Sequence, residues 1–145
     1  MKKIAIGLLA CAALLQAGAA EWMTDLPKAQ AKAKAEKKLV MLDFTGSDWC
    51  GWCIKLHKEV FSKPEFEEYA KKNLVLVEVD FPRGKQQTEE LKKANQKLQQ
   101  KYGIEGYPTL IVLNGEGTKI AESGYVQGGP KAFIADLEKK VKGKS

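Results

Sequence analysis

Two apolar runs dominate the hydrophobic pattern of the chain and predict the centre of a sheet. The run from Lys38 to Thr45 and the run from Leu74 to Asp80 are apolar at almost every position, as in strands that are buried on both faces. The segment between them is long enough for a helical crossover, which is how parallel neighbours are joined. We therefore expect the two strands to pair in parallel, with the second in a central position.

The rest of the pattern predicts helices and a hairpin around these strands. Thr109 to Leu113 and Lys119 to Tyr125 form the hairpin, joined by a turn at 114–117. Periodicity, composition and capping signals predict helices over 26–38, 54–61, 89–101 and 131–141. A further helix should begin at a capping box formed by Ser62 and Glu65 and end near Lys72. The fold class is α/β: a central mixed sheet of about four strands flanked by helices, with an extra N-terminal helix.

The first twenty residues read as a signal peptide. A basic start, Met1-Lys2-Lys3, precedes an apolar stretch and the small residues that end at Ala20. The stretch is too short to span a membrane, and cleavage after Ala19 or Ala20 would leave a domain of residues 21–145 with no membrane span. Lipid attachment at Cys11 is the alternative. We expect a periplasmic or secreted protein.

Composition fits one globular domain and argues against nucleic-acid binding. The chain has 145 residues and 44% of them are hydrophobic, which is enough for a core. When Lys2 and Lys3 are left out, 22 of the 24 basic residues remain against 18 acidic residues, which gives a net charge of +4. Arg83 is the only arginine, and the lysines alternate with Glu and Gln. A nucleic-acid site would want clustered arginine and stacking aromatics.

Two cysteines three positions apart carry the candidate chemistry. Cys50 and Cys53 lie where the first strand turns into a helix, and an exported protein is permitted a disulfide between them. Free N–H groups and the positive end of the helix dipole favour a thiolate, so Cys50 is the expected nucleophile and Cys53 the resolving thiol. A structural zinc site would want four ligands, and His57 is the only other candidate nearby, so we expect no metal. A purely structural disulfide that closes so short a loop would add little stability.

The sequence around this pair resembles thioredoxin-fold proteins. The resemblance rests on W-C-G-W-C at 49–53, on Tyr-Gly-Ile at 102–104 leading into Gly-Tyr-Pro-Thr at 106–109, and on Gly124 before the last helix. It covers essentially the whole of residues 21–145. The chain looks most similar to exported members, including the C-terminal periplasmic domain of the thiol:disulfide interchange protein, in which the cysteine helix also continues into a Phe-Ser-x-Pro segment.

The resemblance implies roles for single residues around the disulfide. Pro108 matches the family's cis-proline, which packs on the disulfide and leaves the backbone of Tyr107 free to pair with an extended substrate, beside Thr109. Asp43 resembles the buried acid that helps to deprotonate the second cysteine. The family has one residue fewer between that acid and the first cysteine, so Asp48 is an alternative source of the same charge.

Other residues near the cysteines are candidates for shielding or for contact with a partner. Trp49 resembles the tryptophan that shields the disulfide, and Gly51 lies between the cysteines. Trp52 is either a partner contact or an exposed aromatic without a special role. The loop from Phe81 to Lys85 follows the second strand, and parallel strands end at one edge of a sheet, so Arg83 and Lys85 should border the site as a positive rim.

These observations predict an exported thiol–disulfide oxidoreductase. It would exchange the Cys50–Cys53 dithiol or disulfide with protein thiols and disulfides, with no cofactor beyond that redox-active disulfide. A membrane electron donor is a candidate partner, and we expect a monomer. Strongly oxidising members of the family carry histidine where this chain has Trp52, which favours a reductase or a weak oxidant. The alternative is a non-catalytic thioredoxin-like binding module, either a chaperone or a metal carrier.

Overall fold

The computed structural model describes residues 19–144 and shows one mixed sheet with the strand order β1-β3-β2-β4-β5. β3 is parallel to both β1 and β2, whereas β4 is antiparallel to β2 and to β5. The strands are β1 (Trp22–Met23), β2 (Leu39–Thr45), β3 (Leu74–Asp80), β4 (Thr109–Leu113) and β5 (Lys119–Ser123). The predicted parallel pair is confirmed, and β3 has a paired strand on each side, as its apolar pattern predicts, while β2 lies in the middle of the order. β1 is the addition to the four expected strands, and two residues are too few to produce a pattern.

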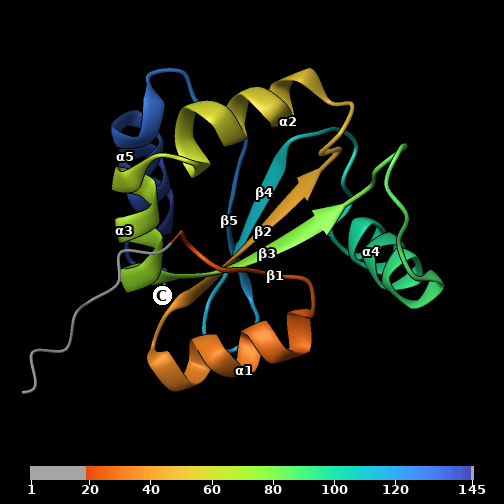
Figure 1. Cartoon of the computed structure of the whole chain (residues 1–145). Coiled ribbons are helices and arrows are strands. Elements are labelled where there is room, and N and C mark those ends of the chain that lie inside the picture. The colour runs from red at the N-terminus through yellow and green to blue at the C-terminus, as the bar shows by residue number, and fades with distance from the viewer. Residues whose placement is uncertain (1–18, 145) are drawn as a thin grey trace, which may run out of the picture.

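Helices cover both faces of the sheet (Figure 1). One face carries α1 (Leu26–Glu36) and α4 (Glu89–Tyr102). The other carries α2 (Gly51–Leu56), which continues into the π-helical turn η1 (His57–Phe61), together with α3 (Pro64–Asn73) and α5 (Gly129–Val141). Among the described residues, no helix has the length and apolar character that crossing a membrane would require.

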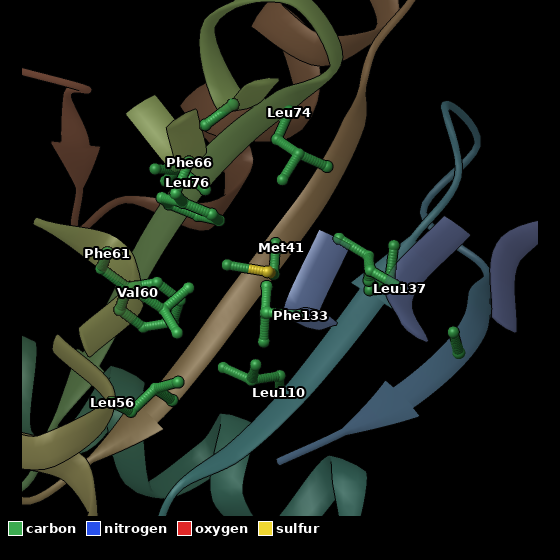
Figure 2. Close-up of a cluster of buried hydrophobic side chains, with 13 residues drawn as sticks. Met41, Leu56, Val60, Phe61, Phe66, Leu74, Leu76, Leu110, Phe133 and Leu137 are labelled. Atoms are coloured by element: carbon green, nitrogen blue, oxygen red, sulfur yellow. The ribbon is translucent and has the colours of Figure 1, made fainter. Parts of the chain in front are cut away.

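Alternation along β2 and β3 builds a separate core on each face. The two strands pair in register from Leu39 opposite Leu74 to Thr45 opposite Asp80, so paired side chains lie on the same face. Met41 lies in the core under η1, α3 and α5 with Phe66, Phe133 and Leu137 (Figure 2). Its neighbours in sequence, Val40 and Leu42, lie in the core under α1 and α4.

The predicted capping box at Ser62 and Glu65 is wrong. α3 begins at Pro64 with Lys63 as its N-cap residue, and no side chain caps it. The Ser62 hydroxyl instead donates a 2.9 Å hydrogen bond to the carbonyl of Lys58. The preceding π-helical turn leaves that carbonyl within reach, and proline at the first helical position needs no partner for an N–H. The hydroxyl therefore bonds to the preceding helical turn instead of capping the next helix.

The turn between β2 and α2 sets the position of the cysteines. The Gly46 carbonyl accepts hydrogen bonds from the N–H groups of Trp49 (3.2 Å) and Cys50 (2.8 Å). Gly46 is buried, and a Cβ atom at this position would overlap the indole ring of Trp49. β2 and β3 end at the same edge of the sheet, where the chain continues into α2 and into the loop before α4 (Figure 1). The two segments that follow these strands therefore meet.

Candidate active site

Cys50 and Cys53 form a disulfide at the start of α2, with their Cα atoms 5.2 Å apart. Cys50 is the N-cap residue, and its Sγ accepts the N–H of Cys53 at 3.2 Å. Their exposed fractions are 7% and 5%, so burial does not separate their roles. Their positions on the helix do separate their roles, because the Cys53 N–H and the helix dipole would stabilise a thiolate on Cys50 in the reduced protein.

The segment before β4 lies against this disulfide. The carbonyl oxygen of Tyr107 is 3.7 Å from Cys50 Sγ, and the peptide bond between Tyr107 and Pro108 is cis. The β2–β4 ladder begins with Thr109 opposite Phe44, so the backbone of Tyr107 lies outside it. The Thr109 hydroxyl donates to the Gly106 carbonyl at 2.7 Å. The substrate-binding role expected of this segment stays a prediction.

Three aromatic rings form a wall beside the disulfide. The Trp49 indole N–H donates to the Phe81 carbonyl at 2.8 Å, and its ring meets that of Tyr107 edge-on at 5.9 Å. Phe81 also packs on Tyr107, with ring centroids 5.4 Å apart. The Arg83 guanidinium lies 3.9 Å above the Trp49 ring. The loop after β3 is therefore in direct contact with the residue that precedes Cys50.

Asp48 anchors this loop. Its carboxylate accepts the backbone N–H groups of Arg83 (3.0 Å) and Gly84 (2.7 Å), and these hydrogen bonds lower the pKa of Asp48. Lys85 Nζ lies 3.3 Å from the carboxylate of Asp80, which is buried at the end of β3. Asp48 thus directs its charge to the loop backbone, a function that differs from the expected supply of charge to Cys53.

A second aromatic contact involves Trp52, which lies between the two cysteines in the chain. Trp52 is 57% exposed, and its ring centroid is 5.1 Å from that of Tyr125. Lys55 Nζ lies 5.1 Å and 5.3 Å from the two ring centroids. Gly51 is exposed, and a Cβ atom there would have nothing within 4 Å. The surface beside the disulfide is open to a partner at these positions.

A polar cavity of about 270 Å³ lies beneath Cys53. Asp43 is 8% exposed, and its Oδ1 is buried without a hydrogen-bond partner. Burial, with the nearby charges of Glu78 and Asp80, raises the pKa of Asp43 to about 8. The cavity is lined by Asp43, Thr45, Ser47, Cys53, Ile54, His57, Glu78 and Lys85. The structure therefore places the predicted buried acid and the second cysteine on one cavity.

Sequence reasoning did not identify Glu78 as a neighbour of the cysteines, and it considered His57 only as a possible zinc ligand. Glu78 interrupts an apolar strand and pairs in register with Asp43, so the predicted parallel pairing was itself a signal for it. His57 is the sole histidine and begins the π-helical turn, which the hydrophobic pattern does not reveal. In the described part of the chain, His, Cys, Asp and Glu side chains form no group of three that could hold a metal ion.

Comparisons with known proteins identify the family and the fold. The model of the thioredoxin-like domain family matches residues 26–140. Disulfide bond reductase DsbH of Chlamydia pneumoniae is 38% identical over 110 residues, which cover 76% of this chain and 66% of that protein. Thiol:disulfide interchange protein DsbD of Klebsiella pneumoniae is 37% identical over 93 residues, which cover 64% of this chain and 14% of that protein.

A solved structure of a DsbH oxidoreductase superposes with a TM-score of 0.81 at 35% identity, and the match covers 88% of each chain. The predicted thioredoxin-like fold and the predicted resemblance to the interchange protein are confirmed. The chain spans about two thirds of DsbH and a small part of DsbD.

The buried Asp43 predicts a stability that falls as pH rises. Its folded pKa of about 8 lies above the value of 3.8 for a free side chain, so its contribution is fully present below about pH 4 and lost as pH rises towards 8. Replacing Asp43 with Asn should therefore stabilise the protein increasingly over this range, by on the order of a few kcal/mol at the upper end. Urea unfolding of the oxidised protein across this range measures the difference. Glu105→Gln, at an exposed carboxyl, should show none of it, and a pH-independent effect of Asp43→Asn would contradict the assignment.

Proposed function

This chain belongs to the thioredoxin-like domain family, and we propose that it is an exported thiol–disulfide oxidoreductase that reduces disulfides in protein substrates. Its relatives include proteins named as a disulfide bond reductase and as thiol:disulfide interchange proteins. One observation carries the proposal: Cys50 caps α2 with its sulfur on the N–H of Cys53, which is the geometry that activates one thiol and leaves its neighbour to resolve.

The reaction follows from this geometry. In the reduced protein the Cys50 thiolate attacks one sulfur of a substrate disulfide, and the other substrate sulfur leaves as a thiolate that takes a proton from solvent. Cys53 loses its proton, attacks Cys50 Sγ in the mixed disulfide, and releases the second substrate thiolate. Two electrons pass from the dithiol to the substrate, and the Cys50–Cys53 disulfide remains. Asp43, on the cavity beneath Cys53, is the base for the second step.

The charges around Cys53 favour the reducing direction. A strong oxidant has a reduced form stabilised by its thiolate. A nearby carboxylate destabilises the thiolate, because a like charge disfavours the ionised form of the thiol. Among the described residues Glu78 lines the cavity beneath Cys53 without an ion pair, whereas Lys85 on the same cavity is paired with Asp80, and Trp52 rather than a histidine precedes Cys53 on α2. These positions support a dithiol that donates its electrons readily.

The substrate would pair with the backbone of Tyr107 in an extended conformation. This backbone lies outside the β2–β4 ladder and faces Cys50 Sγ, with Pro108 and Thr109 beside it. Trp52, which is exposed, and Arg83, which stacks on Trp49, are the further candidate contacts of the substrate. A peptide bound there would bring its own disulfide to Cys50.

We also propose a periplasmic or secreted location and a monomeric protein. The signal-like segment of residues 1–20 supports export, and nearly all of it lies outside the described residues. A reductase in an oxidising compartment needs a source of electrons, so a membrane electron donor would regenerate the dithiol. No cofactor other than the Cys50–Cys53 pair enters the proposed reaction.

Loss of the resolving thiol should trap the substrate. Replacing Cys53 with Ser leaves the mixed disulfide on Cys50 unresolved, so Cys53→Ser should yield covalent complexes on non-reducing gels, and Cys50→Ser should yield none. The wild-type protein should also catalyse insulin reduction by dithiothreitol, which a binding module would not. Equal capture by both variants would contradict the assignment of Cys50 as nucleophile.

The reduction potential should lie near that of a thioredoxin. We expect a value near the roughly −270 mV of thioredoxin and far from the roughly −120 mV of a strong oxidant. Equilibration in glutathione buffers, or against a protein of known potential, measures it. A value close to that of the strong oxidant would overturn the proposed direction and leave the oxidoreductase assignment intact.

The Arg83 rim should favour acidic partners. Changing Arg83 to Glu reverses a charge above Trp49 and should slow reaction with an acidic disulfide peptide about tenfold at low salt. Reaction with a neutral small disulfide should be unaffected, and high salt should remove the difference. Lys131→Glu, an exposed charge reversal on α5, is the matched control. Equal slowing with both disulfides would place Arg83 outside the recognition surface.

A further inference from the structure

Glu78 occupies a position that packing does not explain. It is the one charged residue within the otherwise apolar run of β3 that precedes Asp80, and it is half-buried. Its side chain makes no hydrogen bond or ion pair with another residue of the described chain, although burial and the charge of Asp80 raise its pKa. A half-buried carboxyl without a partner costs stability, which marks it as a candidate for function.

The register of the sheet directs Glu78 to the same cavity as the buried acid. Asp43 and Glu78 are paired residues of parallel strands, so their side chains lie on the same face about one strand spacing apart, roughly 4.8 Å. Both line the cavity of about 270 Å³ beneath Cys53, which has room for several water molecules. The unpartnered Oδ1 of Asp43 is therefore beside a polar space that Glu78 helps to form.

The other charged groups around Asp43 have separate roles. Asp80, also on β3, is held by the backbone N–H and hydroxyl of Ser47 and by Lys85. Lys85 and His57 line the cavity as cations or potential cations, and both lower the pKa of Glu78. β4 contributes Leu110 opposite Asp43, which carries no charge. Apart from Asp43 itself, Glu78 is thus the carboxyl on this cavity that no ion pair among the described residues neutralises.

We propose that Glu78 is a positioning residue of the reaction, which acts on Cys53 through Asp43: its negative charge across the shared cavity holds a proton on Asp43. The inference rests on the proposed oxidoreductase function. Asp43 must be ionised before it takes the proton of Cys53, so Glu78 adds to the effect of burial and raises the pH at which the mixed disulfide is resolved. Near neutral pH, resolution would be slow, which prolongs the covalent complex with the substrate.

The test follows the resolving step alone. Reduced protein is mixed with dithiobis-nitrobenzoate: attack by Cys50 releases one coloured thiolate, and attack by Cys53 on the resulting mixed disulfide releases the second. The rate of the second release is measured against pH. In the wild-type protein it should rise with pH as Asp43 ionises.

Replacing Glu78 with Gln keeps the shape and removes the charge. The inflection of the second release should move down by on the order of one pH unit, so that resolution below the inflection is roughly ten times faster. Glu78→Asp retains the charge and should stay close to the wild-type profile. Glu65→Gln, at an exposed position on α3, is the control and should leave the profile unchanged.

Each outcome separates this inference from the function on which it rests. If the second release is absent in the wild-type protein, the oxidoreductase function itself fails. If it is present and Glu78→Gln leaves the inflection in place, or lowers the rate equally at every pH, Glu78 has only a structural role and the inference is overturned. A shift to lower pH in Glu78→Gln alone supports it.

Discussion

The in-register parallel pairing of β2 with β3 is the constraint on which the rest of the site depends. It ends both strands at one edge of the sheet, with Thr45 opposite Asp80. β2 therefore delivers the cysteine helix where β3 delivers the loop that contacts Trp49. The same register sets Asp43 beside Glu78 beneath Cys53. A shift by one residue would turn Asp43 to the apolar core under α1 and α4, at a large cost in free energy.

The carboxyl groups at this edge show how stability and function compete. Asp80 is satisfied by Ser47 and Lys85, so it serves the structure. Asp43 is almost as buried, and one of its oxygens has no partner. Because a buried carboxyl without a partner is destabilising when ionised, the fold tolerates Asp43 at a cost near neutral pH. A carboxyl that is to exchange a proton with Cys53 must remain free of such partners, and the loss of stability follows from that requirement.

Much of this site could be predicted from sequence because its signals are local. Cys50 and Cys53 lie between a recognisable strand and a helix, and the residues at 106–109 form a motif. The features of the site that the sequence did not predict depend on contacts between segments that are distant in the chain. Asp48 gives no sign in sequence that it binds the backbone of Arg83 and Gly84, and Glu78 became a neighbour of Cys53 only through the register. The capping box failed because the hydroxyl of Ser62 had a nearer acceptor in the preceding turn.

The anchored loop after β3 links recognition to proton transfer. It carries Arg83 to the rim beside the disulfide and Lys85 to the cavity beneath it, two residues apart in the chain. Hydrogen bonds from the backbone N–H groups of Arg83 and Gly84 to Asp48 hold this part of the loop near the cysteines, since Asp48 itself lies two positions before Cys50. Lys85 pairs with Asp80 and lowers the pKa of Glu78, and these are the two carboxyls whose charges act on Asp43. The charge around Asp43 therefore depends on the same loop that carries Arg83 to the rim.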